Sequence, residues 1–155
     1  MADARLGTLW VLHGVNLDML GRRDPAVYGR TTLAELEALV REWGEAEGFT
    51  VRCFQTNHEG EMVEKLHELA GGEVAALLVN PGAWTHYSYA IRDALELVRA
   101  PLAEVHLSDI ERREPWRRRS VVADLAVVRV SGRGVDGYRE AVAALARLVR
   151  EGRGA

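Results

Sequence analysis

A tyrosine and an arginine in one glycine-bounded loop offer the most direct chemistry in this 155-residue sequence. Tyr28 lies in the arginine-rich segment 21–30, shortly after Arg23. A free phenol has a pKa of about 10, and a neighbouring cation favours the charged form of an acid. A loop that brings an arginine against a tyrosine could therefore supply a tyrosinate that removes a proton. The alternative is a surface tyrosine, because most loop tyrosines are not catalytic.

Two histidines near the ends of expected strands suit different roles. His106 follows Glu104 on the same strand face, so the carboxylate can orient or charge the imidazole. This makes His106 a candidate proton donor, although a structural polar pair explains the spacing equally well. His86 falls in the first turn of an expected helix, where the dipole disfavours imidazolium. His86 therefore suits a neutral hydrogen-bonding role.

An arginine cluster surrounds a Glu-Pro-Trp turn in the second half of the chain, and its members are Arg112, Arg113, Arg117, Arg118 and Arg119. We expect most of them to be solvated and one or two to bind a substrate carboxylate or hydroxyl. A single-stranded nucleic-acid platform needs interleaved aromatic residues, and Trp116 alone gives weak support for one.

Several other kinds of site are disfavoured. The histidines lack the close pairings of a metal site, so we expect no metal. The segment 14–21 has neither a GxGxxG fingerprint nor a P-loop, and a nucleotide or flavin cofactor is therefore not indicated. A phosphoacceptor receiver domain would want acidic residues where His13 and Asn80 stand. Lys65, the only lysine, lies in a polar helical stretch, which makes Schiff-base chemistry unfavourable.

Composition and charge describe an ordinary globular protein. Hydrophobic residues make up 48% and charged residues 28%, and residues 1–155 are expected to form one domain. The net charge of −3 gives no reason to expect nucleic-acid binding. Cys53 is alone, which fits a reducing cytoplasm. There is no signal-peptide pattern and no apolar run of about 20 residues, so we expect a cytoplasmic protein that does not engage a membrane.

Apolar, β-rich runs alternate with helical patterns along the chain, which predicts an α/β fold with a parallel sheet. The expected strands cover residues 8–13, 49–55, 74–79, 102–107 and 125–130. The expected helices follow a Thr32–Glu35 capping box, span 59–70, begin at a Thr85 cap, and span 137–151. Polar segments follow four of the strands. Because open parallel sheets bind ligands at the carboxyl ends of their strands, we expect these segments to form the site.

Longer blocks of sequence match a known family in order and spacing. They are HGVNLDMLGRRDPAVYG, QTNHEGEMVEKLHE, NPGAWTHYSYAIRDA, PLAEVHLSDIERREPWRRRS and the GVDGY that opens the last helix. On these motifs the chain resembles type II 3-dehydroquinate dehydratase from about Trp10 to about Leu148. The resemblance implies a flavodoxin-like three-layer sandwich with strand order 2-1-3-4-5, assembled as a homo-oligomeric dodecamer of trimers. It implies dehydration of 3-dehydroquinate to 3-dehydroshikimate, a shikimate-pathway step, with no cofactor and no metal.

The resemblance also assigns roles to matching positions. Tyr28 becomes the base that removes a proton next to the ketone, and Arg23 holds it ionised. Asn16 helps to stabilise the enolate, His106 is the general acid, and Glu104 stands behind it. The substrate's carboxylate and hydroxyls are bound by Asn80, His86, the backbone of Leu107, Ser108 and Arg117. Asp93 matches an acid that reaches a neighbouring subunit's active site.

Several positions depart from the family pattern without removing an assigned residue. They are Val15, Asp24, Pro81, Asp109 and Glu111, and the segment 121–133, with Arg129, Ser131 and Arg133, departs most. Asp109 adds a negative charge beside the expected carboxylate site. Two alternatives therefore stay open: a catalytically weak paralogue that serves as a binding or assembly module, and a lyase for a related polyhydroxy carboxylate.

Overall fold

The computed structural model describes residues 5–154, and within them five parallel strands form one sheet in the order β2-β1-β3-β4-β5. The strands are β1 (Gly7–His13), β2 (Phe49–Gln55), β3 (Ala76–Asn80), β4 (Leu102–His106) and β5 (Val128–Ser131). This is the flavodoxin-like order, and it confirms the predicted α/β architecture. The order changes direction between β1 and β3, which is where such sheets bind ligands.

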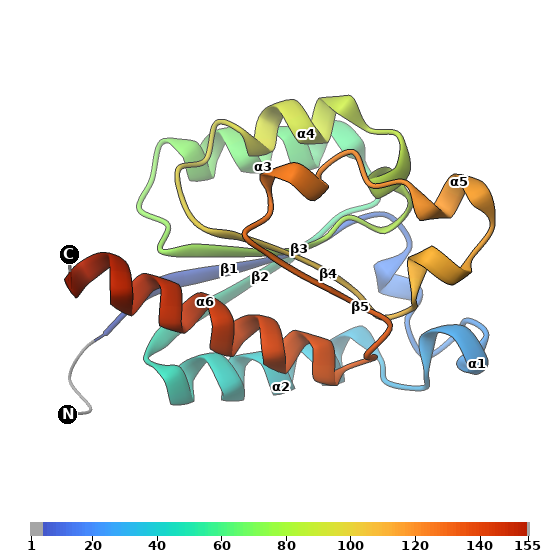
Figure 1. Cartoon of the computed structure of the whole chain (residues 1–155), viewed down its shortest axis with the longest axis horizontal. Helices are drawn as coiled ribbons and strands as arrows, with labels where there is room; N and C mark the ends of the chain where they lie inside the picture. The colour runs from blue at the N-terminus through green and yellow to red at the C-terminus, as the bar shows by residue number, and fades with distance from the viewer. Residues whose placement is uncertain (1–4, 155) are drawn as a thin grey trace.

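Helices cover both faces of the sheet and make three layers (Figure 1). On one face lie α2 (Leu33–Glu47) and α6 (Asp136–Gly154), and on the other lie α3 (Glu59–Ala70) and α4 (Tyr89–Leu95). Successive strand residues point to opposite faces, so Val11 belongs to the first core and Leu12 to the second. Both are fully buried. The sheet is therefore apolar on both sides, and polar groups collect at the strand ends.

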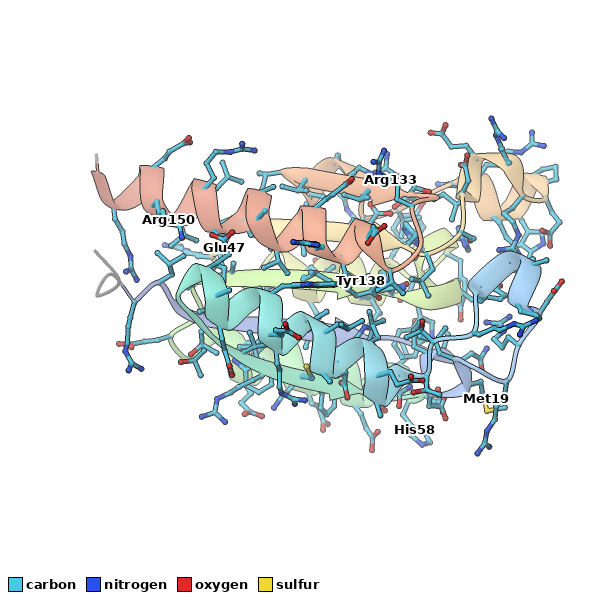
Figure 2. The ribbon with its side chains drawn as sticks, turned by 90° about the horizontal axis from the view of Figure 1, so that it is seen from below. Met19, Glu47, His58, Arg133, Tyr138 and Arg150 are labelled. Atoms are coloured by element: carbon cyan, nitrogen blue, oxygen red, sulfur yellow. The ribbon has the colours of Figure 1, made fainter. Side chains whose placement is uncertain are left out.

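Local sequence signals set several helix ends. Thr32 and Glu35 form the predicted capping box at the start of α2, and Gly48 ends that helix in the left-handed conformation. At this carboxyl end of α2, Arg150 of α6 forms an ion pair with Glu47, at 2.9 Å (Figure 2). Among the described residues, no helix is long and apolar enough to cross a membrane.

Several predicted boundaries were wrong: β3 begins at Ala76 instead of residue 74, and α6 continues to Gly154 instead of 151. Two further errors have a clear physical cause. Thr85 does not cap α4; it lies in the 3-10 helix η2 (Gly82–His86), and the Ser88 side chain accepts the capping hydrogen bond from Ile91. The fifth strand begins at Val128 instead of residue 125, because residues 123–125 form the 3-10 helix η4 (Ala123–Leu125). Pairing sets this start: Val127 donates its amide hydrogen to Leu102 at the first residue of β4.

Short helices lie in the loops at the carboxyl end of the sheet (Figure 1). The long loop after β1 contains η1 (Leu17–Met19) and α1 (Pro25–Tyr28), and the loop after β4 contains η3 (Ile110–Arg112) and α5 (Pro115–Arg118). Among the predicted site residues, α1 carries Tyr28 and α5 carries Arg117, and the loops around these helices carry Asn16, Arg23 and Ser108.

Candidate active site

A cavity opens at the carboxyl ends of β1, β3 and β4, where the sheet's strand order reverses. Its wall brings together eight of the predicted site residues, which are Asn16, Arg23, Tyr28, Asn80, His86, Leu107, Ser108 and Arg117. Apolar side chains such as Leu20 and Ile110 complete the wall. A concave, partly apolar site with a few converging polar groups is typical of small-molecule binding.

Tyr28 is held between two arginines. The Arg23 guanidinium lies over the Tyr28 ring, 4.1 Å from its centroid, and Nη2 of Arg113 donates to the Tyr28 hydroxyl at 3.1 Å. Helix α1 presents the ring at its last residue, since Asp24 caps this helix by accepting from the Ala26 amide and Pro25 occupies its first position. The hydrogen-bonding cation is therefore Arg113, and the loop arginine Arg23 stacks instead.

Arg113 is the functional candidate that the sequence analysis did not single out. Its Nη1 also donates to the Ser108 hydroxyl at 3.1 Å. Burial disfavours the charged guanidinium, but the hydrogen bond and charge of Tyr28, with Glu114, outweigh it and raise the pKa of Arg113. The sequence has five arginines within positions 112–119. Only the folded structure shows that Arg113 is the one that contacts Tyr28.

The cavity floor, which Val15 and Gly82 line, belongs to two loops in close backbone contact. A Cβ on Gly14 would stand 2.1 Å from the Pro81 carbonyl oxygen, and a Cβ on Gly82 would stand 2.5 Å from that of Val15. Among the described residues other than glycine, only Asn16 has a positive φ, at 70°. Asparagine tolerates this conformation. The floor is therefore closed by the lack of side chains at two positions.

A hydrogen-bonded chain behind the wall orients Asn80. Its Nδ2 donates to the Tyr138 hydroxyl at 3.0 Å, and its Oδ1 accepts from the Gly82 amide at 3.2 Å. The same hydroxyl lies 3.1 Å from Nε2 of His13. Burial lowers the pKa of His13 to about 4 and raises that of Tyr138, which projects from α6 (Figure 2). Both groups are therefore neutral at pH 7, and the tautomer of His13 decides which of them donates the hydrogen.

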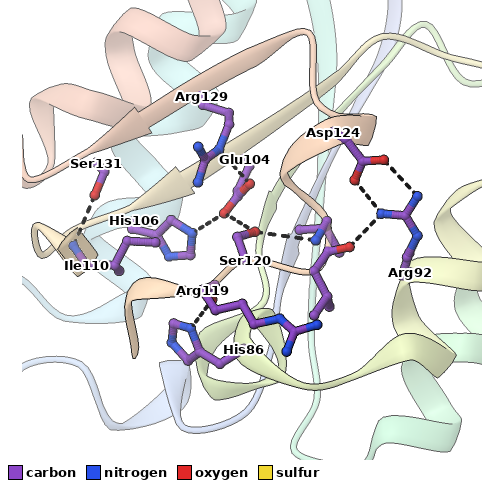
Figure 3. A network of polar contacts seen from close by, with 12 residues as sticks. His86, Arg92, Glu104, His106, Ile110, Arg119, Ser120, Asp124, Arg129 and Ser131 are labelled. Atoms are coloured by element: carbon purple, nitrogen blue, oxygen red, sulfur yellow. Dashed lines mark hydrogen bonds and ion pairs between the residues drawn. The ribbon is translucent and has the colours of Figure 1, made fainter. Parts of the chain in front are cut away.

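His86 is a neutral hydrogen-bonding group, as predicted, but for another reason. It ends η2 instead of starting a helix, so the dipole argument was wrong. Burial is the largest cause that lowers the pKa of His86. Its Nδ1 donates to the Arg119 carbonyl at 2.6 Å (Figure 3), which leaves Nε2 as an acceptor.

Glu104 and His106 lie in a neighbouring hollow, which shares Ile110 with the cavity wall. His106 Nε2 is 2.6 Å from Glu104 Oε2, and Ser120 and Arg129 also donate to this carboxylate (Figure 3). Burial acts to raise the pKa of Glu104, but the hydrogen bonds and positive charge outweigh it and lower that pKa. The predicted pairing is present, although His106 is outside the cavity wall.

Asp93 also lies outside the cavity wall, at an exposed position of α4. In residues 5–154, no three His, Cys, Asp or Glu side chains come together as a candidate metal site.

A model of the Dehydroquinase class II family matches residues 7–146. The chain belongs to the class II dehydroquinase family. A 3-dehydroquinate dehydratase from Syntrophotalea carbinolica is 51% identical over 90% of this chain and 95% of its own, and one from Pelobacter propionicus is 51% identical over 92% and 95%. The crystal structure of type II dehydroquinase from Propionibacterium acnes is also similar, with a TM-score of 0.86 and 41% sequence identity. The match covers 90% of the present class II dehydroquinase and 96% of the Propionibacterium acnes chain. Membership makes the protein a hydro-lyase.

Proposed function

We propose that this class II dehydroquinase removes water from 3-dehydroquinate through an enolate, with Tyr28 as the base. The observation that carries this proposal is the placement of Tyr28 on the cavity wall between Arg23 and Arg113. A base must reach the proton that it removes, and Tyr28 stands on the wall of the cavity that would hold the substrate, with both guanidinium groups in contact with it. The dehydratase names of relatives at 51% identity supply the substrate.

The departing proton leaves an enolate whose negative charge needs donors. Asn16 stands on the cavity wall where its amide, or a water that it binds, can supply one. His106 is then the general acid that protonates the leaving hydroxyl, and Glu104 orients it from behind at 2.6 Å. Because the hollow of His106 adjoins the cavity at Ile110, closure around the substrate has to bring the hydroxyl to His106.

The remaining predicted residues bind the substrate's carboxylate and hydroxyls. Arg117 supplies a charge for the carboxylate, and Ser108 and the backbone of Leu107 supply neutral donors. Neutral His86 accepts from a hydroxyl through Nε2. Asn80 offers its second amide hydrogen, since the first is bound to Tyr138. This acid–base scheme is proposed to operate without metal or cofactor, so activity should survive exhaustive chelation.

The proposed active form is a dodecamer of trimers in the cytoplasm, with Asp93 completing a neighbouring subunit's site. The exposed position of Asp93 on α4 is consistent with such a contact. Light scattering measures the assembly. An Asp93→Ala variant that stays fully active as a monomer would contradict this part of the proposal.

A direct assay tests the proposed reaction. Purified protein is mixed with 3-dehydroquinate, and ultraviolet absorbance follows the conjugated carbonyl that dehydration creates. We expect steady product formation, with no loss of enzyme when borohydride is added with substrate, because no imine is formed. Folded protein that gives no absorbance change would refute the proposed reaction. It would favour a binding module or a lyase for a related polyhydroxy carboxylate.

A further inference from the structure

The outermost strand of the sheet supplies a cation to the carboxylate behind His106. Glu104 of β4 and Arg129 of β5 are direct partners in the parallel register. Nε of Arg129 donates to Oε1 of Glu104 at 3.0 Å, while Oε2 faces His106 and Ser120 (Figure 3). The Glu104 side chain is 1% exposed and that of Arg129 is 42% exposed. Arg129 therefore connects a buried anion to the solvent-facing edge of the sheet.

The charge balance of this cluster determines where a proton rests. Without Arg129, the neutral arrangement of the buried pair would be a Glu104 carboxylate with a protonated His106. A buried pair of this kind holds its proton tightly, since losing it leaves a lone buried anion. With Arg129 bound to Glu104, the neutral arrangement has an unprotonated His106, and protonating it adds a net positive charge.

We propose that Arg129 is a positioning residue that neutralises Glu104, so that His106 releases its proton more readily than a Glu104–His106 pair would allow. A general acid works best when it gives up its proton near the operating pH. The kinetic side of this inference rests on the proposed function, whereas the protonation of His106 does not.

Neighbouring charges do not replace this contribution. Besides Glu104 and Arg129, the titratable groups that face His106 are His86 from η2 and Asp109 and Glu111 beside it in the hollow. Asp109 is paired with Arg112, and Glu111 is exposed. Both are acidic and favour protonated His106, and His86 is held neutral by burial. Arg129 is the cation that contacts the Glu104 carboxylate, at 3.0 Å.

A purely structural role for Arg129 predicts a different outcome. If Arg129 only satisfied Glu104, an uncharged donor such as glutamine would replace it, as Ser120 already donates to the other oxygen at 2.9 Å. If its charge matters, lysine should replace it and glutamine should not. Arg129→Lys, Arg129→Gln and Arg129→Met therefore form the test set. Arg133→Met is the matched control, because Arg133 pairs with Glu140 on the surface and its removal changes the net charge equally.

The protonation of His106 is measured without reference to activity. Deuterium exchange at the imidazole Cε1 position, followed by mass spectrometry across a pH series, reports the titration of single histidines in assemblies of any size. Trypsin cleaves after Arg99 and Arg112, which leaves His106 as the only histidine of its peptide. We expect the midpoint to rise by about 0.5–1 pH unit in Arg129→Met and Arg129→Gln. Arg129→Lys and Arg133→Met should stay near the parent protein.

Steady-state kinetics complete the test. Arg129 does not line the cavity, so KM should change little. At a pH where His106 is fully protonated, kcat in the two uncharged variants should fall by no more than the roughly 3- to 10-fold that a midpoint shift of about 0.5–1 pH unit allows. The limb of the kcat profile that needs a protonated acid should move to higher pH. Circular dichroism checks the fold, and if Arg129→Met does not fold, the Gln–Lys comparison decides.

An unmoved His106 midpoint in the uncharged variants would overturn the inference, as would a glutamine variant that behaves like lysine. A shifted midpoint in a protein without dehydratase activity would instead count against the proposed function alone.

Discussion

Nη2 of Arg113 lies 3.1 Å from the hydroxyl oxygen of Tyr28, although 85 positions separate them in the chain. Tyr28 ends α1 in the loop after β1, and Arg113 follows η3 in the loop after β4. The hydrogen bond therefore joins the two loops that form opposite parts of the cavity wall. The position of the proposed base depends on both.

Replacing Tyr28 by phenylalanine removes the proposed base and leaves the ring. We expect kcat to fall about 10²- to 10⁴-fold, the usual contribution of a general base, with an unchanged circular dichroism spectrum. Tyr87→Phe, at an exposed site outside the cavity wall, is the control and should keep parent activity. Near-normal turnover by Tyr28→Phe would contradict the assignment.

Arg113→Met should lower kcat/KM about 100-fold, because it removes a charged donor to Tyr28 and the donor to Ser108. Its sequence neighbour supplies the comparison. Arg112 has a side chain that is 87% exposed and pairs only loosely with Asp109, so Arg112→Met should change kcat/KM less than about twofold. Equal effects of the two substitutions would show that general charge, and not the Tyr28 contact, is what matters.

Buried His13 should make stability depend on pH. Burial lowers its pKa from 6.5 to about 4, so the unfolded chain takes up a proton between these values that the folded protein does not. The associated stability is complete above pH 6.5 and is lost as the pH falls through this window. The loss amounts to about 3 kcal/mol at its largest. Urea unfolding at fixed protein concentration, repeated from pH 7 to pH 4, measures it.

His13→Asn should flatten that pH dependence, whatever it does to stability at pH 7. His58→Asn, at an exposed position, should leave the slope as in the parent protein. If the parent and His13→Asn proteins lose stability in parallel, the stability loss belongs to other groups, such as Glu104, whose pKa is also lowered.

Gly14→Ala and Gly60→Ala should act in opposite directions on thermal stability. A Cβ at Gly14 meets the Pro81 carbonyl at 2.1 Å, so we expect a loss of about 2–3 kcal/mol. A Cβ at Gly60 in α3 has no neighbour within 4 Å and gains helix propensity, which should stabilise by about 0.5–1 kcal/mol. Melting temperatures that rise for both would show that the loops at the floor separate easily.

The two hydroxyl residues near the start of α4 should also respond oppositely. Thr85 is fully buried and its hydroxyl has no hydrogen-bond partner in the described part of the chain, so Thr85→Val should keep or raise stability by about 1 kcal/mol. Ser88 caps the helix, and Ser88→Ala should cost about 1 kcal/mol. Denaturant midpoints measure both, and a destabilised Thr85→Val would indicate a partner for that hydroxyl.

Periodicity was sufficient to predict β2 and α3 with their observed bounds, because each has an unbroken pattern between clear end signals. It failed where two local signals compete. Thr85 and Ser88 can both cap a helix, and only packing selects Ser88. Leu125 is apolar like a strand residue, but β5 can begin only where β4 offers a partner, at the Ala103–Val128 pair.

The candidate site, like the fold, was predictable where local sequence sets a residue's position and unpredictable where long-range contacts do. Side chains that follow strand ends were predictable, because parallel strands deliver them to one rim; Asn16 and Asn80 are examples. Arg113 and Tyr138 reach the site or its support through contacts across 85 and 58 positions, and no local pattern encodes those distances. Arg129 was visible as a departure from the family pattern, but its contact with Glu104 required the register of β5.

The contact of Gly14 with Pro81 and of Gly82 with Val15 has a consequence for inhibition. Val15 and Gly82 line the cavity at this floor, and a side chain at Gly82 would collide with the Val15 carbonyl and disturb the fold before it altered the surface that a ligand meets. Resistance to an inhibitor usually arises by exchanging the side chains it touches. A compound that drew its affinity from the floor, and not from the arginines of the wall, would leave few substitutions by which the protein could escape it.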